Sequence, residues 1–164
     1  MRRQGAGVMQ QVQYPKEEDA MNQSRQDKLQ LLGRLLFGVL FIVAGVRKSM
    51  AFAGSAAYMA KNGVPMAEEL LVLTLILEIG GGLLLVLGWH TRLIAAVLAL
   101  FVVVVTPIFH GFWTFEPALM ANQLNHFIKN CAVVGGLLYV WAHGAGGISM
   151  DARAVPEFEE SDDS

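Results

Sequence analysis

Four long apolar segments, separated by short polar stretches, occupy the middle of the chain. They run over 29–46, 69–88, 93–109 and 119–143. A helix needs roughly 20 mostly apolar residues to cross a bilayer core about 30 Å thick. The pattern therefore predicts an all-α protein, an integral membrane four-helix bundle that occupies residues 29–143.

A short helix is expected between the first two apolar segments. The stretch "AFAGSAAYMAKNGVP" contains small and apolar residues without forming a long apolar run. Ser55 is a suitable helix cap, Gly63 a suitable stop, and Pro65 a suitable opening residue for the next helix. These signals predict a small helix at the membrane interface.

The two ends of the chain are polar. Residues 1–28 are rich in Gln and mixed in charge, and the final residues "EFEESDDS" are acidic. Segments with few large apolar residues cannot bury enough surface to fold alone. We therefore expect residues 1–28 to form a disordered or loosely helical cytoplasmic extension and residues 144–164 to form an acidic cytoplasmic tail.

The distribution of Lys and Arg predicts the orientation. Five lie in the first 28 residues, and Arg92 and Arg153 raise the count on that side of the membrane to seven. The opposite side carries three, namely Arg47, Lys48 and Lys61. Because Lys and Arg accumulate in cytoplasmic loops, both termini are expected in the cytoplasm.

Composition agrees with a membrane protein. The chain is 54% hydrophobic and only 16% charged, whereas globular domains carry about 25% charged residues. Nothing in it combines basic and aromatic residues in a way that suggests nucleic-acid binding. A single cysteine, Cys131, excludes an internal disulfide and a CxxC redox pair.

Each apolar segment has one helix face that combines polar and small residues. At 100° per residue, Arg34 and Lys48 share a face of the first segment with glycines, and Glu78 shares a face of the second with Gly81 and Gly82. Such faces prefer protein to lipid, so we expect a polar interior in which Arg34, Lys129 or both hold Glu78. Two interpretations remain open: structural ion pairing, or a site for a substrate, a quinone or protons.

The candidate binding residues are the polar groups of these faces. Two histidines and Glu116 have the chemistry of metal ligands, but their spacing matches no established ligand motif, so no metal site is expected. No cofactor is identifiable from a motif. The candidates for the polar interior are Arg34, Lys48, Glu78, His110, Asn122, His126, Lys129 and Asn130.

Several stretches in order resemble the DoxX family of small four-helix membrane proteins. They are "RLLFGVLFIVAGVRK", "NGVP", "LEIGGGLLLVLGWHTRLIA" and "HFIKNCAVVGGLL". The resemblance implies a multi-pass protein of the bacterial inner membrane, in a family with some members associated with terminal oxidases or thiosulfate–quinone oxidoreduction. It places the family's polar positions on Arg34, Lys48, Glu78, Arg92, Lys129 and Asn130.

The resemblance favours a membrane subunit or partner of a redox system that is quinone- or sulfur-linked, in which the polar interior accepts a quinone or a sulfur compound. A non-enzymatic membrane binding or scaffold protein with structural intramembrane charges is one alternative. A small transporter is another. The expected partners are the lipid bilayer, redox partner proteins and, in an oligomer, further copies of the chain. Whether the chain is itself an enzyme stays open.

Overall fold

A computed structural model describes residues 17–154, and every regular element within that range is a helix. Two irregular turns interrupt the α-helices: a π-helical turn, η1, and a 3-10 turn, η2. The elements in order are α1 (Glu17–Met50), α2 (Phe52–Lys61), α3 (Ala67–Leu75), η1 (Ile76–Gly80), α4 (Gly81–Leu87), α5 (Thr91–His110), η2 (Phe112–Thr114), α6 (Pro117–His143) and α7 (Met150–Arg153).

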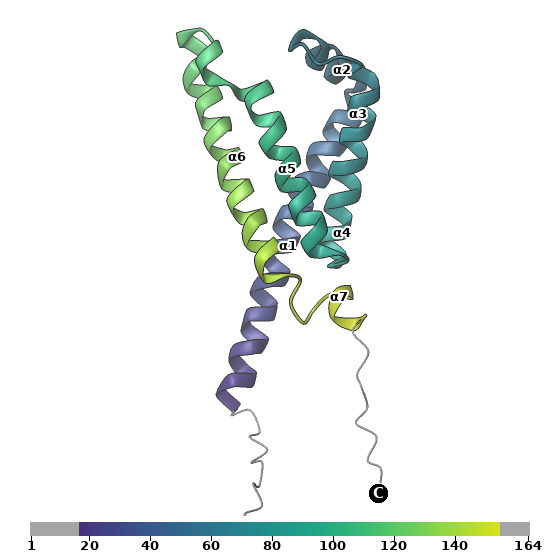
Figure 1. Cartoon of the computed structure of the whole chain (residues 1–164), viewed down its shortest axis with the longest axis vertical. Coiled ribbons are helices and arrows are strands. Elements are labelled where there is room, and N and C mark those ends of the chain that lie inside the picture. The colour runs from purple at the N-terminus through teal and green to yellow at the C-terminus, as the bar shows by residue number, and fades with distance from the viewer. Residues whose placement is uncertain (1–16, 155–164) are drawn as a thin grey trace, which may run out of the picture.

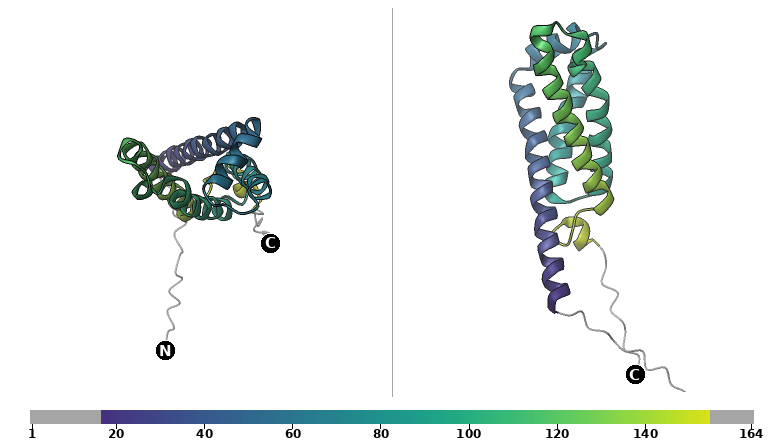
Figure 2. Two further views of the ribbon diagram at one scale, coloured as in Figure 1. Left: turned by 90° about the horizontal axis from the view of Figure 1, so that it is seen from above. Right: turned by 90° about the vertical axis from the view of Figure 1, so that its left-hand side faces the viewer.

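Four long helical rods form the bundle. Helices α1, α5 and α6 are three of them, and α3, η1 and α4 join end to end as the fourth. The first rod packs mainly on η1 and α4, while α5 and α6 form the other closely packed pair. The two pairs lie together near α7 and separate toward the opposite end, and both ends of the described chain emerge on the α7 side (Figures 1 and 2).

Three of the rods are long and apolar enough to cross a membrane. They correspond to Glu17–Met50, Ala67–Leu87 and Thr91–Thr114. Many of their leucines and valines are exposed on the outside of the bundle, as lipid-facing residues would be. The predicted all-α membrane bundle is confirmed. Helix α6 is about 40 Å long but polar in its first half, so its role as a fourth span stays a prediction.

The first helix begins earlier than the sequence suggested. Helix α1 starts at Glu17, so residues 17–28 are helical and not disordered. Three acidic residues, Glu17, Glu18 and Asp19, occupy its first turn, where negative charge is favourable. The expectations for residues 1–16 and 155–164 lie outside the described residues.

The short interfacial helix exists, but its predicted start is wrong. Helix α2 begins at Phe52, and the Ser55 hydroxyl bonds to the carbonyl of Lys48 in the preceding helix. Pro65 does not open the next helix, because Met66 adopts a left-handed conformation immediately before α3. The chain therefore turns from α1 through α2 into α3 with little loop.

Two glycines set the spacing between α1 and α4. A Cβ atom at Gly38 would lie 2.7 Å from the carbonyl oxygen of Gly82, and one at Gly82 would lie 2.8 Å from the carbonyl oxygen of Gly38. Since neither backbone can carry a side chain here, the two helices approach each other directly. This contact fixes the position of α1 along the bundle axis relative to α4.

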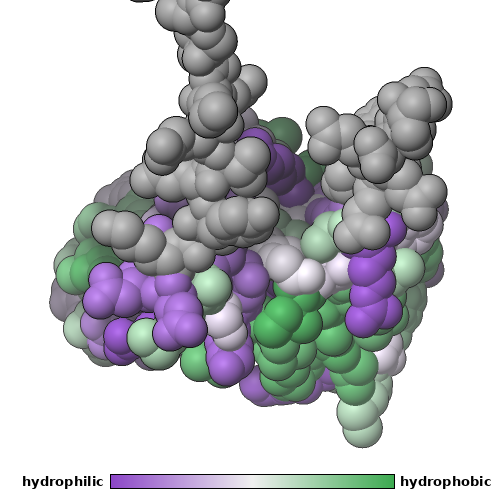
Figure 3. Space-filling model, turned by 90° about the horizontal axis from the view of Figure 1, so that it is seen from below, coloured by the Kyte–Doolittle hydropathy of each residue, from purple (hydrophilic) through white to green (hydrophobic). Residues whose placement is uncertain are grey.

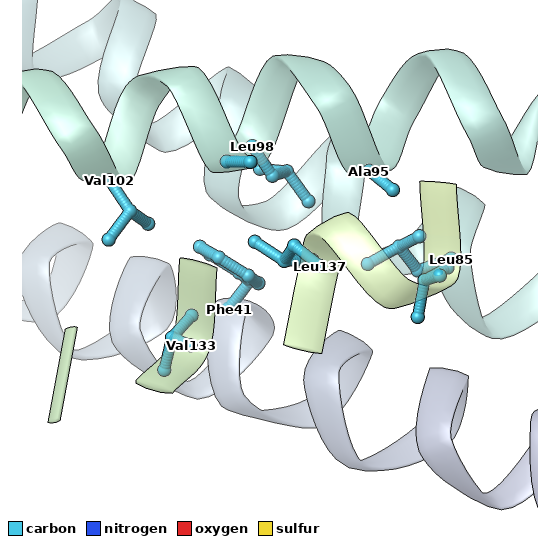
Figure 4. Packing of buried hydrophobic residues seen from close by; sticks show 9 residues of the cluster. Phe41, Leu85, Ala95, Leu98, Val102, Val133 and Leu137 are labelled. Carbon is cyan, nitrogen blue, oxygen red and sulfur yellow. The ribbon is translucent and has the colours of Figure 1, made fainter. Parts of the chain in front are cut away.

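The apolar core occupies the half of the bundle nearer α7. Figure 4 shows side chains of α1, α5 and α6 converging there. On α6 no buried residue precedes Val133, and on α5 none follows Thr106. Farther from α7, the rings of Tyr58 in α2 and Phe109 in α5 stack with centroids 5.7 Å apart and join the two helix pairs. The core consists of Phe41, Leu85, Ala95, Leu98, Ala99, Val102, Val133, Leu137 and Val140.

Candidate functional site

The bundle is closed at the α7 end by a buried arginine. Arg34 is 1% exposed, and its guanidinium donates hydrogen bonds to the carbonyls of Leu85 and Ile148. The first carbonyl lies in α4 and the second in the segment after α6. Gly88, in a left-handed conformation, leaves the space that the guanidinium fills. Arg34 therefore connects three parts of the chain and lies far from Glu78.

The segment after α6 is held across this end by further polar contacts. The amide of Gly147 donates to Asp27 at 2.8 Å, and the carboxylate of Asp151 accepts from the amides of His90 and Thr91 at 2.7 and 2.9 Å. Asp151 thus caps the start of α5, which has no cap of its own. Seen from below, hydrophilic surface lies on both sides of a hydrophobic area at this end (Figure 3).

These contacts also determine the acidity of Asp151. Burial alone raises the pKa of the carboxyl, but the hydrogen bonds from the Thr91 and His90 amides outweigh it, and the pKa lies below its ordinary value of 3.8. The charged form of Asp151 is therefore the one that the folded end of the bundle stabilises.

The opposite half of the bundle contains a large groove, called here the inter-helix groove. It has a volume of about 930 Å³ and separates α1, α2, α3 and η1 from α5 and α6. Exposed side chains such as Leu73, Val104 and Ile108 line it, so the groove opens sideways, toward lipid in a membrane. Its walls are mostly apolar, with a few charged and amide groups. These polar lining residues are Arg47, Lys48, Ser55, Thr74, Glu78, His110, Lys129 and Asn130.

An ion pair lies on one wall of the groove. The ammonium of Lys48 contacts both carboxylate oxygens of Glu78, at 2.6 and 2.7 Å. The Glu78 side chain is 5% exposed, whereas that of Lys48 is 38% exposed. Glu78 is thus the buried anchor of the pair, and the Lys48 ammonium faces the open space.

The predicted partners of Glu78 are wrong. Arg34 is bound near α7, and Lys129 contacts His126 Nδ1 at 3.3 Å. The reason is how far α1 is shifted along the bundle axis relative to η1. Gly45 lies directly beside Glu78, because a Cβ atom added to Gly45 would be 3.2 Å from the Glu78 Cβ. Lys48, one turn after Gly45, therefore reaches the carboxylate. Glu78 also lies within the π-helical turn η1, a distortion that frequently occurs at functional sites.

The other wall of the groove carries amide and imidazole groups. Asn130 of α6 donates to the hydroxyl of Thr106 in α5 at 3.0 Å, and that hydroxyl donates to the Val102 carbonyl. His110 Nδ1 lies 2.9 Å from Gln123 Oε1. These bonds connect α5 and α6 at the level where the apolar core ends.

The two candidate histidines do meet. The rings of His110 and His126 stack with centroids 4.9 Å apart. Within the described residues, no group of three or more His, Cys, Asp or Glu side chains is placed to hold a metal ion. The pair instead forms part of the polar end of the α5–α6 hairpin.

The polar face of α6 is only partly inside the bundle. Asn130 is half-buried, but Asn122, Asn125 and Lys129 are exposed. The expectation that the whole polar face of α6 points into the bundle is therefore wrong, because the part of α6 that precedes Val133 is not packed in the core. Arg47, Tyr58 and Phe109 also line the groove but were not among the predicted candidates. Their helices meet only in the folded bundle, so no pattern within one helix identifies them.

The lining of the groove is amphipathic. Leucine and valine side chains form most of its walls, and Lys48, Lys129 and Asn130 supply polar groups. Small-molecule sites commonly combine apolar walls with a few polar groups in a cavity of roughly 300–1,000 Å³. Of the eight predicted candidates, Lys48, Glu78, His110, Lys129 and Asn130 line the groove, while Arg34, Asn122 and His126 do not.

Comparison with known proteins identifies relatives of the chain. A sequence model described as DoxX matches residues 29–111. Inner membrane protein YphA of Escherichia coli (strain K12) is 30% identical over 125 residues, which cover 76% of this chain and 89% of that protein. Inner membrane protein YqjF of the same organism is 37% identical over 121 residues, covering 74% of this chain and 88% of that protein. No solved structure matches the chain.

Proposed function

The chain belongs to the DoxX family of integral inner-membrane proteins, and we propose that it is the membrane partner of a redox system and binds a quinone in the inter-helix groove. The observation that carries this proposal is the groove itself: a volume of about 930 Å³ with apolar walls, open sideways, and a charged pair on one wall. A quinone has the matching form, with a polar head and an apolar tail.

The apolar walls account for the tail. Leu73 on α3 and Val104 and Ile108 on α5 lie on opposite sides of the groove and are partly exposed. In the bilayer these surfaces contact hydrocarbon, so an isoprenoid tail can enter from the side without crossing water. Because the tail leaves hydrocarbon and not water, its binding depends on packing against these walls and on the polar head, since lipid tails are as apolar as leucine.

The polar residues account for the head. The Lys48 ammonium, held in place by Glu78, has three protons and can donate to a quinone carbonyl oxygen. Lys129 offers a second donor from the opposite wall. Because Glu78 is bound at both oxygens, its role in this proposal is to orient Lys48.

Electron transfer in this proposal involves a second protein. A quinone takes up two electrons and two protons on reduction, and the partner redox protein supplies or accepts the electrons. The chain binds and orients the quinone and keeps its head inside the bilayer. The proposal therefore concerns binding and positioning, and leaves the electron-carrying groups to the partner.

Two adjacent valines provide a matched test of quinone binding. Val103 and Val104 of α5 are each 52% exposed, but only Val104 lines the groove. The full chain is reconstituted in nanodiscs without quinone, and binding of a short-chain quinone is measured by equilibrium partition. We expect saturable binding, a loss of about tenfold or more in Val104→Trp, where the indole fills the groove, and little change in Val103→Trp.

Equal loss in the two variants would place the quinone elsewhere or attribute the loss to a general effect on the bundle. Absence of saturable binding to the parent chain would reject the proposal. A melting temperature within a few degrees of the parent for both variants is the control for folding.

A further inference from the structure

Positive charge exceeds negative charge along the inter-helix groove. Arg47, Lys48 and Lys129 line it, whereas Glu78 is the sole carboxylate among its described lining residues. Lys48 already contacts both oxygens of that carboxylate. The groove therefore presents two cations, Arg47 and Lys129, for which the lining residues contain no second carboxylate.

Lys129 is the more unusual of these two cations. It lies roughly 18 Å along α6 from Pro117 and roughly 21 Å from His143, near the middle of the helix. Its polar contact is His126, at 3.3 Å, and the only salt bridge within residues 17–154 is the one between Lys48 and Glu78. A charge inside a span is costly and normally has a partner of opposite charge, and Lys129 has such a position if α6 is the fourth span, as predicted.

We infer that the groove selects a ligand with a negatively charged head, and that Lys129 is the residue that pairs with this head. The inference rests on the proposed function, because it concerns the head of the same groove-bound molecule. Within the quinone class, the ligand it describes is an ionised hydroxyquinone that carries an apolar tail. Charge complementarity favours this occupant over a neutral quinone.

The geometry explains why Lys129, and not Lys48, distinguishes charged from neutral heads. The charge of Lys48 is already balanced by Glu78, so a second anion there adds little. Lys129 has no such balance among the described residues. An ionised oxygen near its ammonium would form a charge-assisted hydrogen bond, which is roughly twice as strong as a neutral one.

Two probes that differ in charge test the inference. One is a long-chain alkyl hydroxynaphthoquinone, which is an anion at neutral pH, and the other is its neutral methyl ether. Each is titrated into the full chain in nanodiscs of neutral phospholipid. We expect the anion to bind at least about tenfold more tightly to the parent, since that ratio corresponds to about 1.4 kcal/mol, a modest value for one ion pair in a partly dry site.

Three variants separate charge in the groove from charge elsewhere. Lys129→Gln removes the proposed partner and should lose most of the preference for the anion, whereas Lys129→Arg should keep it. Lys61→Gln makes the same charge change on the exposed end of α2, outside the groove, and should leave the preference unchanged.

The outcomes distinguish this inference from the proposed function. If the parent binds both probes equally well, selection of a charged head is wrong, while quinone binding stands. If neither probe binds, the proposed function itself fails. Equal effects of Lys129→Gln and Lys61→Gln would overturn the assignment of Lys129, and displacement of the anionic probe by an anionic phospholipid would assign the groove to lipid headgroups.

Discussion

Removing the ammonium of Lys48 should destabilise the bundle by leaving Glu78 without a partner inside it. The Glu78 side chain is 5% exposed, and both of its oxygens bond to Lys48 at 2.6 and 2.7 Å. Breaking a buried ion pair costs about 3–5 kcal/mol, whereas an exposed pair contributes about 0.2–1 kcal/mol. Because Lys48 is 38% exposed, we expect an intermediate loss of about 2–3 kcal/mol for Lys48→Met.

This loss can be measured as a melting temperature in a mild detergent. For a chain of this size each kcal/mol corresponds to about 2–4 °C, so Lys48→Met should melt roughly 4–12 °C below the parent. Combining it with Glu78→Leu removes the unpaired carboxylate and should restore most of the difference. Lys61→Met, on the exposed end of α2, is the control and should melt with the parent.

Either of two results would refute the reasoning. If Lys48→Met melts at the temperature of the parent, the ion pair contributes nothing to the folded bundle. If the double variant loses the sum of the two single losses, the two side chains act independently. In both cases the contact between Lys48 and Glu78 would not be a source of stability for the bundle.

Three further predictions concern the rest of the bundle. Gly38→Ala should lower the melting temperature by the equivalent of about 1–3 kcal/mol, because a Cβ would collide with Gly82, whereas Gly33→Ala in the same helix meets open space and should be neutral or slightly stabilising. Asp151→Asn should be less stable than the parent above pH 3.8; since folding lowers the pKa of Asp151, the difference should vanish as the pH falls through the lowered pKa, as melting curves across this range would show. Reporter fusions before α1 and after α7 should both give cytoplasmic signals, and a periplasmic signal from either would reject the predicted orientation.

The helical spans could be predicted because they depend on local properties. The length and hydropathy of an apolar run are visible in the sequence, and three predicted segments match helices that can cross a membrane. A charged residue inside such a run is equally visible, which is why Glu78, Lys129 and Asn130 were identified as candidates. The family resemblance rested on the same stretches and is confirmed by the match over 29–111.

The partner of Glu78 could not be predicted, because it depends on the height of one helix against another. Counting residues from the ends of two spans assumes that both spans end at the same depth. The actual shift of one helix along the other is set by the Gly38–Gly82 contact and by Gly45 beside Glu78. These are close backbone contacts, and glycines in a span indicate that a contact exists without indicating its partner.

The closure at the α7 end was also beyond sequence reasoning. Asp151 caps a helix that begins 60 residues earlier in the chain, and Asp27 binds an amide 120 residues away. The polar residues involved looked like those of a solvated tail. The π-helical turn at Ile76–Gly80 likewise has no signature in an apolar run that is compatible with an ordinary helix.

Photochemical crosslinking with a quinone tests the central claim most directly. The full chain in nanodiscs is irradiated with a photoreactive quinone, and the labelled peptides are identified by mass spectrometry. If the inter-helix groove holds the quinone, the labels lie on lining residues such as Tyr58, Val104 and Ile108, and excess unlabelled quinone removes them. Labels spread over the exposed outer surface, including Leu36 and Leu100, that persist in excess quinone would contradict the claim.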